Sequence, residues 1–141
     1  MRPARTQQKP SRLASPNPIM KRFRLGRSYT RRQINSVLGG SLQHYLPHVS
    51  GKVVCGCFVT RKNPDAPCVI LPGRGPSIRR WAEAFAAQKT AVPVFLKERT
   101  NAWKYIGDYR VRERTTETSV VRAQEKRSGR KISQVLYLQA S

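Results

Sequence analysis

The stretch VPVFLKERTNAWKYIGDYRVRE, residues 92–113, decides the fold, because it contains two β-rich runs on either side of a short turn. The first run covers residues 92–98 and is largely apolar, and the second covers residues 103–113. A connection as short as RTNA, residues 99–102, joins antiparallel strands and is too short for a parallel crossover. We therefore expect the two strands to be antiparallel neighbours in a sheet.

Large side chains alternate along the second strand, where Trp103, Tyr105, Tyr109 and Val111 would share one face with Gly107 among them. One interpretation is that this face packs the core, as aromatic strand faces commonly do. However, a glycine inside a strand often marks a bulge or the close approach of a ligand. Tyrosine and tryptophan are also the side chains on which nucleobases stack. We expect Tyr109 and Val111 in the core and a binding site nearer the turn.

Helices and strands intermix along the rest of the chain. The segment YTRRQINSVLGG predicts a helix that starts at Thr30, with Gln33 completing a capping-box pattern and Gly39-Gly40 ending it. Further helices are predicted at residues 77–89 and 116–130, and further strands at residues 52–59, 68–71 and 132–139. The predicted fold is α+β, with a small, mostly antiparallel curved sheet or β-barrel of about five strands flanked by about three helices.

The 141 residues are enough for one domain, and their positive charge is unevenly distributed. Residues 1–27 contain eight basic residues, four prolines and no acid, so they are predicted to be a disordered basic tail. Residues 28–141 are predicted to be the folded domain. They hold the other 20 of the 28 basic residues and all seven acids, which leaves a net charge of +13.

Such a positive field favours a polyanion as partner, and counterion release makes nucleic acid the first candidate. A membrane partner is not expected, because no apolar run approaches a membrane span and no long basic amphipathic helix appears. Three cysteines, an odd number, argue for a reducing compartment. We expect a cytoplasmic, nucleoid-associated protein.

The segment PGRGPSIRR, residues 72–80, places basic residues at a predicted helix start. Backbone N–H groups at a helix N-terminus favour phosphate, although a solvated basic helix face would have the same composition. On the first helix, Arg31 and Arg32 are expected to point away from the apolar face. The start of the helix predicted at residues 77–89 is therefore a candidate for contacting a nucleic-acid backbone.

The sequence gives little support for a metal site or for a catalytic site. His44, His48 and the cysteines Cys55, Cys57 and Cys68 fit no standard zinc spacing, and the acidic residues are scattered. We expect no metal, no cofactor and no enzymatic activity, with a nucleic-acid-acting enzyme as the less favoured alternative.

Taken together, YTRRQINSVLGG, NPDAP, SIRRWAEAF and VPVFLKERTNAWKYIGDYRV resemble an uncharacterised bacterial domain of PUA-like fold. This broad group contains the SRA, EVE and ASCH domains, and similar segments accompany HNH-type restriction endonucleases. The resemblance covers about residues 29–113, and its W-x-Y-x-G-x-Y-x-V pattern is similar to a strand of SRA-like domains.

The resemblance implies a compact β-barrel with a concave pocket for a flipped-out or unpaired base. Trp103 and Tyr105 would then stack on the base, and Asn101 and Asp108 would read its edge. Phosphates would be held by Arg31, Arg32, Arg74, Arg79, Arg80, Lys97 and Arg99. Because no nuclease domain is attached, a separate nuclease or effector would be the partner.

The resulting hypothesis is a non-catalytic DNA-binding module that reads modified or flipped-out bases through an aromatic pocket in a basic face. The main alternative is an RNA-binding or ribosome-associated structural protein, in which the aromatic residues belong only to the core. DNA is favoured over RNA as the partner.

Overall fold

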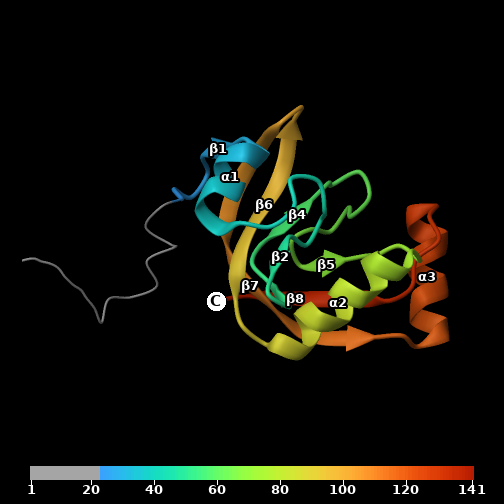
Figure 1. The fold of residues 1–141 in the computed structure, drawn as a ribbon. Helices are drawn as coiled ribbons and strands as arrows, with labels where there is room; N and C mark the ends of the chain where they lie inside the picture. The colour runs from blue at the N-terminus through green and yellow to red at the C-terminus, as the bar shows by residue number, and fades with distance from the viewer. Residues whose placement is uncertain (1–22) are drawn as a thin grey trace, which may run out of the picture.

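A computed structural model describes residues 23–141 and is built around a six-stranded sheet (Figure 1). Its strand order is β4-β6-β7-β8-β5, with β1 paired to β7, while β2 and β3 form a separate two-stranded sheet. The strands are β1 (Ser28–Tyr29), β2 (His48–Val49), β3 (Lys52–Val53), β4 (Gly56–Phe58), β5 (Val69–Ile70), β6 (Val92–Arg99), β7 (Ala102–Thr115) and β8 (Val135–Ala140). The helices are α1 (Arg31–Leu38), α2 (Pro76–Gln88) and α3 (Thr118–Ser128).

The predicted hairpin is confirmed, since β6 and β7 pair antiparallel from Val92↔Tyr109 to Arg99↔Ala102. In the six-stranded sheet only β4 pairs parallel, with β6, so the α+β, mostly antiparallel prediction is confirmed. β7 pairs with β6 along its first half and with β8 along its second, and Figure 1 shows it turning between the two. Among the described strands, β4 and β5 end the sheet and do not pair with each other, so the sheet stays open and does not close into a barrel.

A β-bulge lies in the middle of β7. Val94 of β6 pairs with Gly107, but the next residue, Phe95, pairs with Tyr105, so Ile106 is inserted between the two pairs. Gly107 has a φ of +120°, which L side chains rarely adopt. The glycine that suggested a bulge in the sequence does lie at one.

The bulge changes which face of the sheet the odd-numbered residues occupy. Trp103 and Tyr105 pack into a cluster with Ile34 of α1, whereas Val111 packs into a second cluster with Phe85 of α2. The expectation that the whole aromatic row shares one face is therefore wrong. An inserted residue shifts a two-residue alternation by one position, so each half of the row faces a different layer.

Three apolar clusters fill the space on the two faces of the sheet. The cluster against α2 includes Phe58, Ala82, Phe85, Val94 and Leu136, and the cluster against α1 includes Phe23, Ile34, Cys55, Cys57 and Phe95. A smaller cluster of Leu71, Ile132 and Val135 receives side chains of α3. The helices therefore pack at different places on the sheet, with α1 near the turn of the β6–β7 hairpin and α2 near its other end.

The start of α1 confirms the capping box. Thr30 Oγ1 accepts a hydrogen bond from Gln33 N at 3.1 Å, and Gln33 Oε1 accepts one from Thr30 N at 2.8 Å. Gly39 ends the helix as expected. At α2 Gly75 takes the N-cap position and Pro76 begins the helix, one residue before the predicted start at residue 77.

Some element boundaries differ from the prediction. The run 52–59 is two strands rather than one, since β3 pairs with β2 and β4 pairs with β6. β1 and β2 were not predicted, because two-residue strands carry no periodic signal. None of the helices in the described part of the chain is long and apolar enough to cross a membrane.

The folded unit includes residues that we assigned to the tail. Phe23 is 4% exposed, and Gly26 N donates a hydrogen bond to Tyr105 O at 2.8 Å. Tyr105 N in turn donates to Arg27 O at 2.9 Å. Residues 23–27 therefore pack along β7, while the rest of the predicted tail, residues 1–22, lies outside the described residues.

Candidate nucleic-acid interface

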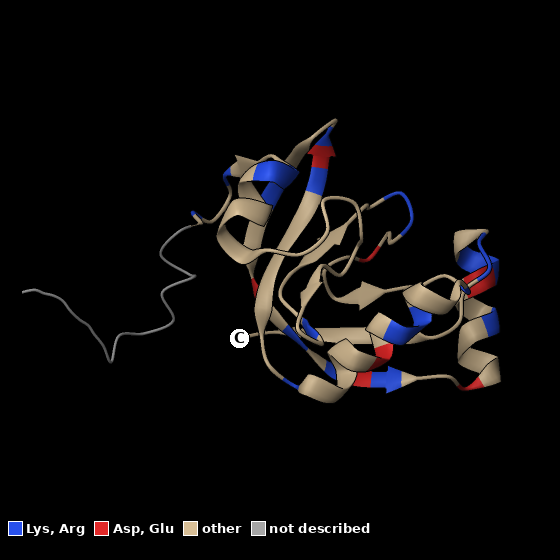
Figure 2. Cartoon of the chain, in the orientation of Figure 1, with Lys and Arg blue, Asp and Glu red and all other residues tan. Residues whose placement is uncertain are grey.

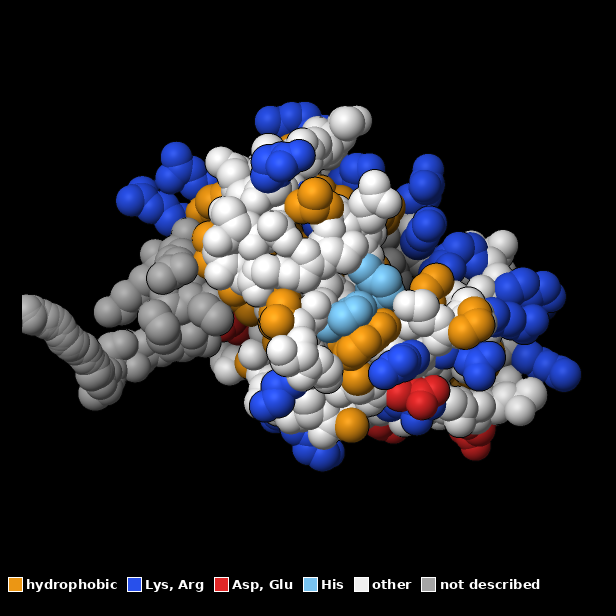
Figure 3. All heavy atoms as spheres, in the orientation of Figure 1, with side chains coloured by type: hydrophobic (Ala, Val, Ile, Leu, Met, Phe, Trp, Pro, Cys, Tyr) orange, Lys and Arg blue, Asp and Glu red, His pale blue; other side chains and the backbone are white. Residues whose placement is uncertain are grey.

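A cavity of about 540 Å³ lies where the hairpin, the start of α2 and several loops meet. A volume of this order is typical of small-molecule sites. Figure 3 shows the two histidines near the middle of this face, beside hydrophobic side chains and surrounded by basic ones. The described residues that line the cavity are Arg31, Leu42, Gln43, His44, Tyr45, Cys57, Phe58, Val59, Lys62, Asn63, Ile70, Leu71, Pro72, Gly73, Ile78, Lys97, Trp103 and Arg130.

Trp103 supplies an aromatic wall of the cavity and has two cations near its ring. The guanidinium carbon of Arg31 is 5.2 Å from the ring centroid, and Lys97 Nζ is 5.8 Å from it. Cations at this distance are attracted to the negative face of an indole. Trp103 is only 8% exposed, so it is a packed part of the cavity wall and not a freely moving side chain.

Arg31 does not point into solvent as the helical pattern suggested. Its Nη2 donates hydrogen bonds to Ser41 O at 3.0 Å and to His44 O at 2.8 Å, and the residue is 8% exposed. The capping box at Thr30 fixes the first turn of α1, and this places Arg31 against the loop at residues 41–44. Arg31 therefore holds a wall of the cavity in place, and its charge lies at the cavity surface.

The cavity carries positive charge without a carboxylate in its lining. Four of the described lining residues are Lys or Arg, namely Arg31, Lys62, Lys97 and Arg130. None of the four forms an ion pair within residues 23–141, although six ion pairs occur elsewhere in that part of the chain. All seven acids of the sequence lie outside the lining. Figure 2 shows basic residues on the hairpin tip, on the loop after β4 and along α2 and α3.

Tyr105 and Asp108, two of the predicted base contacts, do not line the cavity. They are 3% and 5% exposed, and the Tyr105 hydroxyl donates to Asp108 Oδ1 at 2.7 Å. Burial, with the hydrogen bond to this carboxylate, raises the pKa of Tyr105. The two side chains therefore satisfy each other inside the cluster against α1.

Asn101 lies at the hairpin turn, outside the cavity, with a φ of +49°. Its Oδ1 accepts a hydrogen bond from Arg31 N at 3.2 Å, which ties the turn to the start of α1. Of the four predicted base contacts, only Trp103 is in the lining.

The predicted phosphate contacts fall into separate groups. Arg31 and Lys97 line the cavity, whereas Arg32, Arg99, Arg79 and Arg80 are exposed outside it. Arg74 pairs with Glu125 at 2.8 Å, and together with Arg79 it lines a second groove near α3. Arg80 lies over the ring of Trp81, 5.2 Å from its centroid.

One residue of the cavity lining, His44, belongs to a histidine pair with His48. The His48 ring stacks on Trp81 with centroids 3.4 Å apart, and His44 meets His48 edge-on at 5.3 Å. Burial lowers the pKa of His44, and the neighbouring His48 and Arg31 lower it further. Within residues 23–141, no group of three or more His, Cys, Asp or Glu side chains is placed to hold a metal ion.

Solved structures with a similar fold include an SRA domain. The SRA domain of SUVH5, crystallised with hemimethylated CG DNA, aligns with a TM-score of 0.57 and 18% identity over 83% of this chain and 87% of that one. KRYPTONITE, in a complex with mCHG DNA and SAH, aligns with a TM-score of 0.56 and 11% identity over 84% of this chain and 32% of that one. At these identities the likeness shows the fold, which confirms the SRA-like, PUA-like architecture.

Comparison with curated proteins finds no match. A family model matches residues 28–138, which is most of the chain and nearly all of the residues that the structure describes. The chain therefore belongs to the family described as Domain of unknown function (DUF6697).

Proposed function

We propose that this protein is a non-catalytic DNA-binding module that takes an unpaired or flipped-out base into the cavity beside Trp103. The observation that carries the proposal is the lining of that cavity, which combines an aromatic wall with four basic side chains and no acid. The fold adds support, because a domain of similar fold was crystallised with hemimethylated DNA. An extruded base needs both a surface to stack against and positive charge for its backbone.

The lining residues divide this work between them. Trp103 and Tyr45 offer ring surface, and the cavity volume of about 540 Å³ admits a ligand larger than one base. Lys97 and Lys62 are exposed at the rim, where they can neutralise phosphates on either side of the extruded nucleotide. Arg32 and Arg99, near the start of α1 and the hairpin turn, extend the basic surface.

In this proposal the module only binds DNA, and any cleavage of the DNA or downstream signal comes from another protein. A separate nuclease or effector would act where this module marks a modified or distorted site, in the cytoplasm at the nucleoid. RNA is the competing partner, since counterion release acts on any nucleic-acid backbone.

The test is an anisotropy titration of three 20-base-pair duplexes at two salt concentrations. One duplex is fully paired, one has a base opposite an abasic site, and one carries 5-methylcytosine. The duplex with the unpaired base should bind more tightly, because extrusion costs least where pairing is already lost. A single-stranded RNA of matched length completes the set and distinguishes the competing partner.

Matched variants locate the contact. Lys97→Gln removes an exposed charge at the cavity rim, and Lys52→Gln removes an exposed charge on β3, outside the lining. Lys97→Gln should weaken binding and should reduce the slope of log affinity against log salt concentration by about one. Lys52→Gln should have a smaller effect on both quantities. Equal affinity for all three duplexes, with equal effects of the two variants, would leave only a generic polyanion binder.

A further inference from the structure

We propose that the cavity selects an extruded base that carries an anionic substituent, such as a carboxylate on C5 of a pyrimidine. This inference rests on the proposed function and names the class of base that the site takes. The observation behind it is the composition of the cavity lining. The described lining contains positively charged hydrogen-bond donors but no carboxylate acceptor.

The donors come from parts of the chain that are far apart in sequence. Arg31 and Lys97 both lie within 5.8 Å of the Trp103 ring centroid, and Lys62 and Arg130 come from two loops. Reading the amino group of an ordinary or methylated cytosine calls for an acceptor, for which proteins use Asp or Glu. Here the buried acid on β7, Asp108, is already bonded to Tyr105 and does not reach the lining.

Arg130 is the most informative of these groups. Its Nη2 donates to Leu71 O at 2.6 Å and to Lys62 O at 3.0 Å, so two neutral carbonyls hold the guanidinium. Its Nε is buried and has no hydrogen-bond partner within residues 23–141. A buried donor of a charged group without an acceptor is costly, and an anionic ligand would offset that cost.

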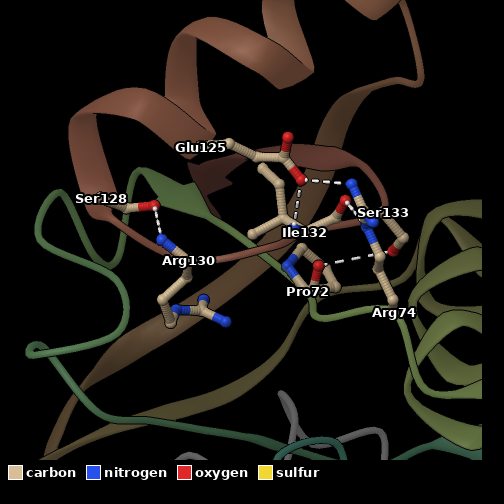
Figure 4. Close-up of polar contacts among 7 residues, drawn as sticks. All are labelled: Pro72, Arg74, Glu125, Ser128, Arg130, Ile132 and Ser133. Carbon is tan, nitrogen blue, oxygen red and sulfur yellow. Dashed lines mark hydrogen bonds and ion pairs between the residues drawn. The ribbon is translucent and has the colours of Figure 1, made fainter.

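The backbone around Arg130 is anchored, which makes the guanidinium a fixed feature of the cavity. Glu125 Oε2 accepts hydrogen bonds from Arg74 Nη2 and from Ile132 N, both at 2.8 Å. Ser133 N donates to Pro72 O at 2.9 Å. Figure 4 shows this network around Glu125 and Arg74, with the Arg130 side chain directed away from it.

No acid of the chain lines the cavity, whereas some of the basic residues outside it have an acidic partner. Arg127 pairs with Asp65, Lys104 pairs with Glu98 at 3.3 Å, and Arg74 pairs with Glu125. A charge-assisted hydrogen bond from Arg to a carboxylate is stronger than a neutral one, so a carboxylate in this cavity gains more than a methyl group. We expect about tenfold tighter binding of the carboxylated base.

The test uses the full chain and duplexes of one sequence in which the base opposite an abasic site is cytosine, 5-methylcytosine or 5-carboxylcytosine. The 5-carboxylcytosine duplex should bind about tenfold more tightly than the 5-methylcytosine duplex. As competitors, the nucleoside 5-carboxy-2′-deoxycytidine should displace the duplex, and 2′-deoxycytidine 5′-monophosphate should do so less effectively. Equal competition would mean that the cavity takes a phosphate, which would overturn the proposal.

Variants separate this inference from the proposed function. Arg130→Gln should remove the preference for the carboxylate while the affinity for the cytosine duplex falls less, and Arg122→Gln, exposed on α3 outside this lining, should keep the preference. If Arg130→Gln fails to fold, Lys97→Gln and Lys62→Gln should each reduce the preference. Tight binding of every unpaired base without preference would overturn this inference and leave the proposed function intact. No gain from an unpaired base would overturn both.

Discussion

Replacing Tyr105 with Phe distinguishes a structural role for the buried Tyr105–Asp108 pair from the base-reading role that the sequence suggested. The change removes one hydroxyl from a residue that is 3% exposed and keeps the ring that packs against Phe23 and Phe95. What is lost is the hydrogen bond to Asp108 Oδ1, 2.7 Å long in the native protein.

The magnitude follows from the burial of the partner. Asp108 is 5% exposed, so its carboxylate loses a hydrogen-bond donor where water has little access. Removing one partner of a buried polar pair costs about 1–3 kcal/mol of folding free energy, with the upper end for charged groups. The cavity lining is untouched, so the affinity for each DNA duplex should stay within a factor of about two of the wild-type value.

The assay pairs urea denaturation, which gives the free energy of unfolding, with the anisotropy titration of the three duplexes. Tyr137→Phe is the matched control, because the Tyr137 hydroxyl makes no hydrogen bond within residues 23–141 and its removal should change little. A variant that keeps its unfolding free energy but loses its preference among duplexes would refute the reasoning, since Tyr105 would then contact the base.

Three further predictions address the framework of the site. Gly107→Ala should destabilise the protein by about 1–3 kcal/mol in urea denaturation, because its φ of +120° strains an L residue, whereas Gly73→Ala, at ordinary φ, should cost less. Thr30→Ala should lower the free energy of unfolding by about 1 kcal/mol, because it removes the capping box of α1, whereas Thr30→Ser should keep most of that stability. Equal losses in the two variants would show that the side-chain hydroxyl is not the stabilising group. Because the pKa of His44 is lowered in the folded state, the unfolded chain takes up the proton first, so stability should fall as pH drops below about 6.5, while DNA affinity should rise once His44 is protonated. His44→Gln should flatten both responses, and an unchanged pH profile would contradict this assignment.

The parts of the fold that sequence predicts are those with local causes. The β6–β7 hairpin follows from its short turn, the start of α1 from the Thr30–Gln33 capping box, and α2 from its apolar spacing. The parts that it misses depend on pairing between distant segments. β1 and β2 have only two residues each. β3 and β4 belong to different sheets because β3 pairs with β2 and β4 pairs with β6.

The bulge at Gly107 explains why Tyr105 and Asp108, two of the predicted base contacts, lie outside the cavity. Tyr105 and Asp108 are three residues apart and would point to opposite faces in a regular strand, but the inserted residue brings them together. Trp103, Arg31 and Lys97 were among the predicted contacts because aromatic and basic residues stand out in a strand or helix, and all three line the cavity. Lys62 and Arg130 lie in loops far apart in sequence, and only the folded chain brings them to one cavity.

The most direct test of a base-binding cavity is photocrosslinking from the base itself. A duplex with 5-iodouracil opposite an abasic site would be irradiated with the protein, and the crosslinked peptide would be identified by mass spectrometry after trypsin digestion. The crosslink should fall in residues 100–104, which contain Trp103, or on another residue of the cavity lining. A fully paired 5-iodouracil duplex should crosslink less. Crosslinks confined to exposed residues outside the cavity would contradict the proposal that a base enters it.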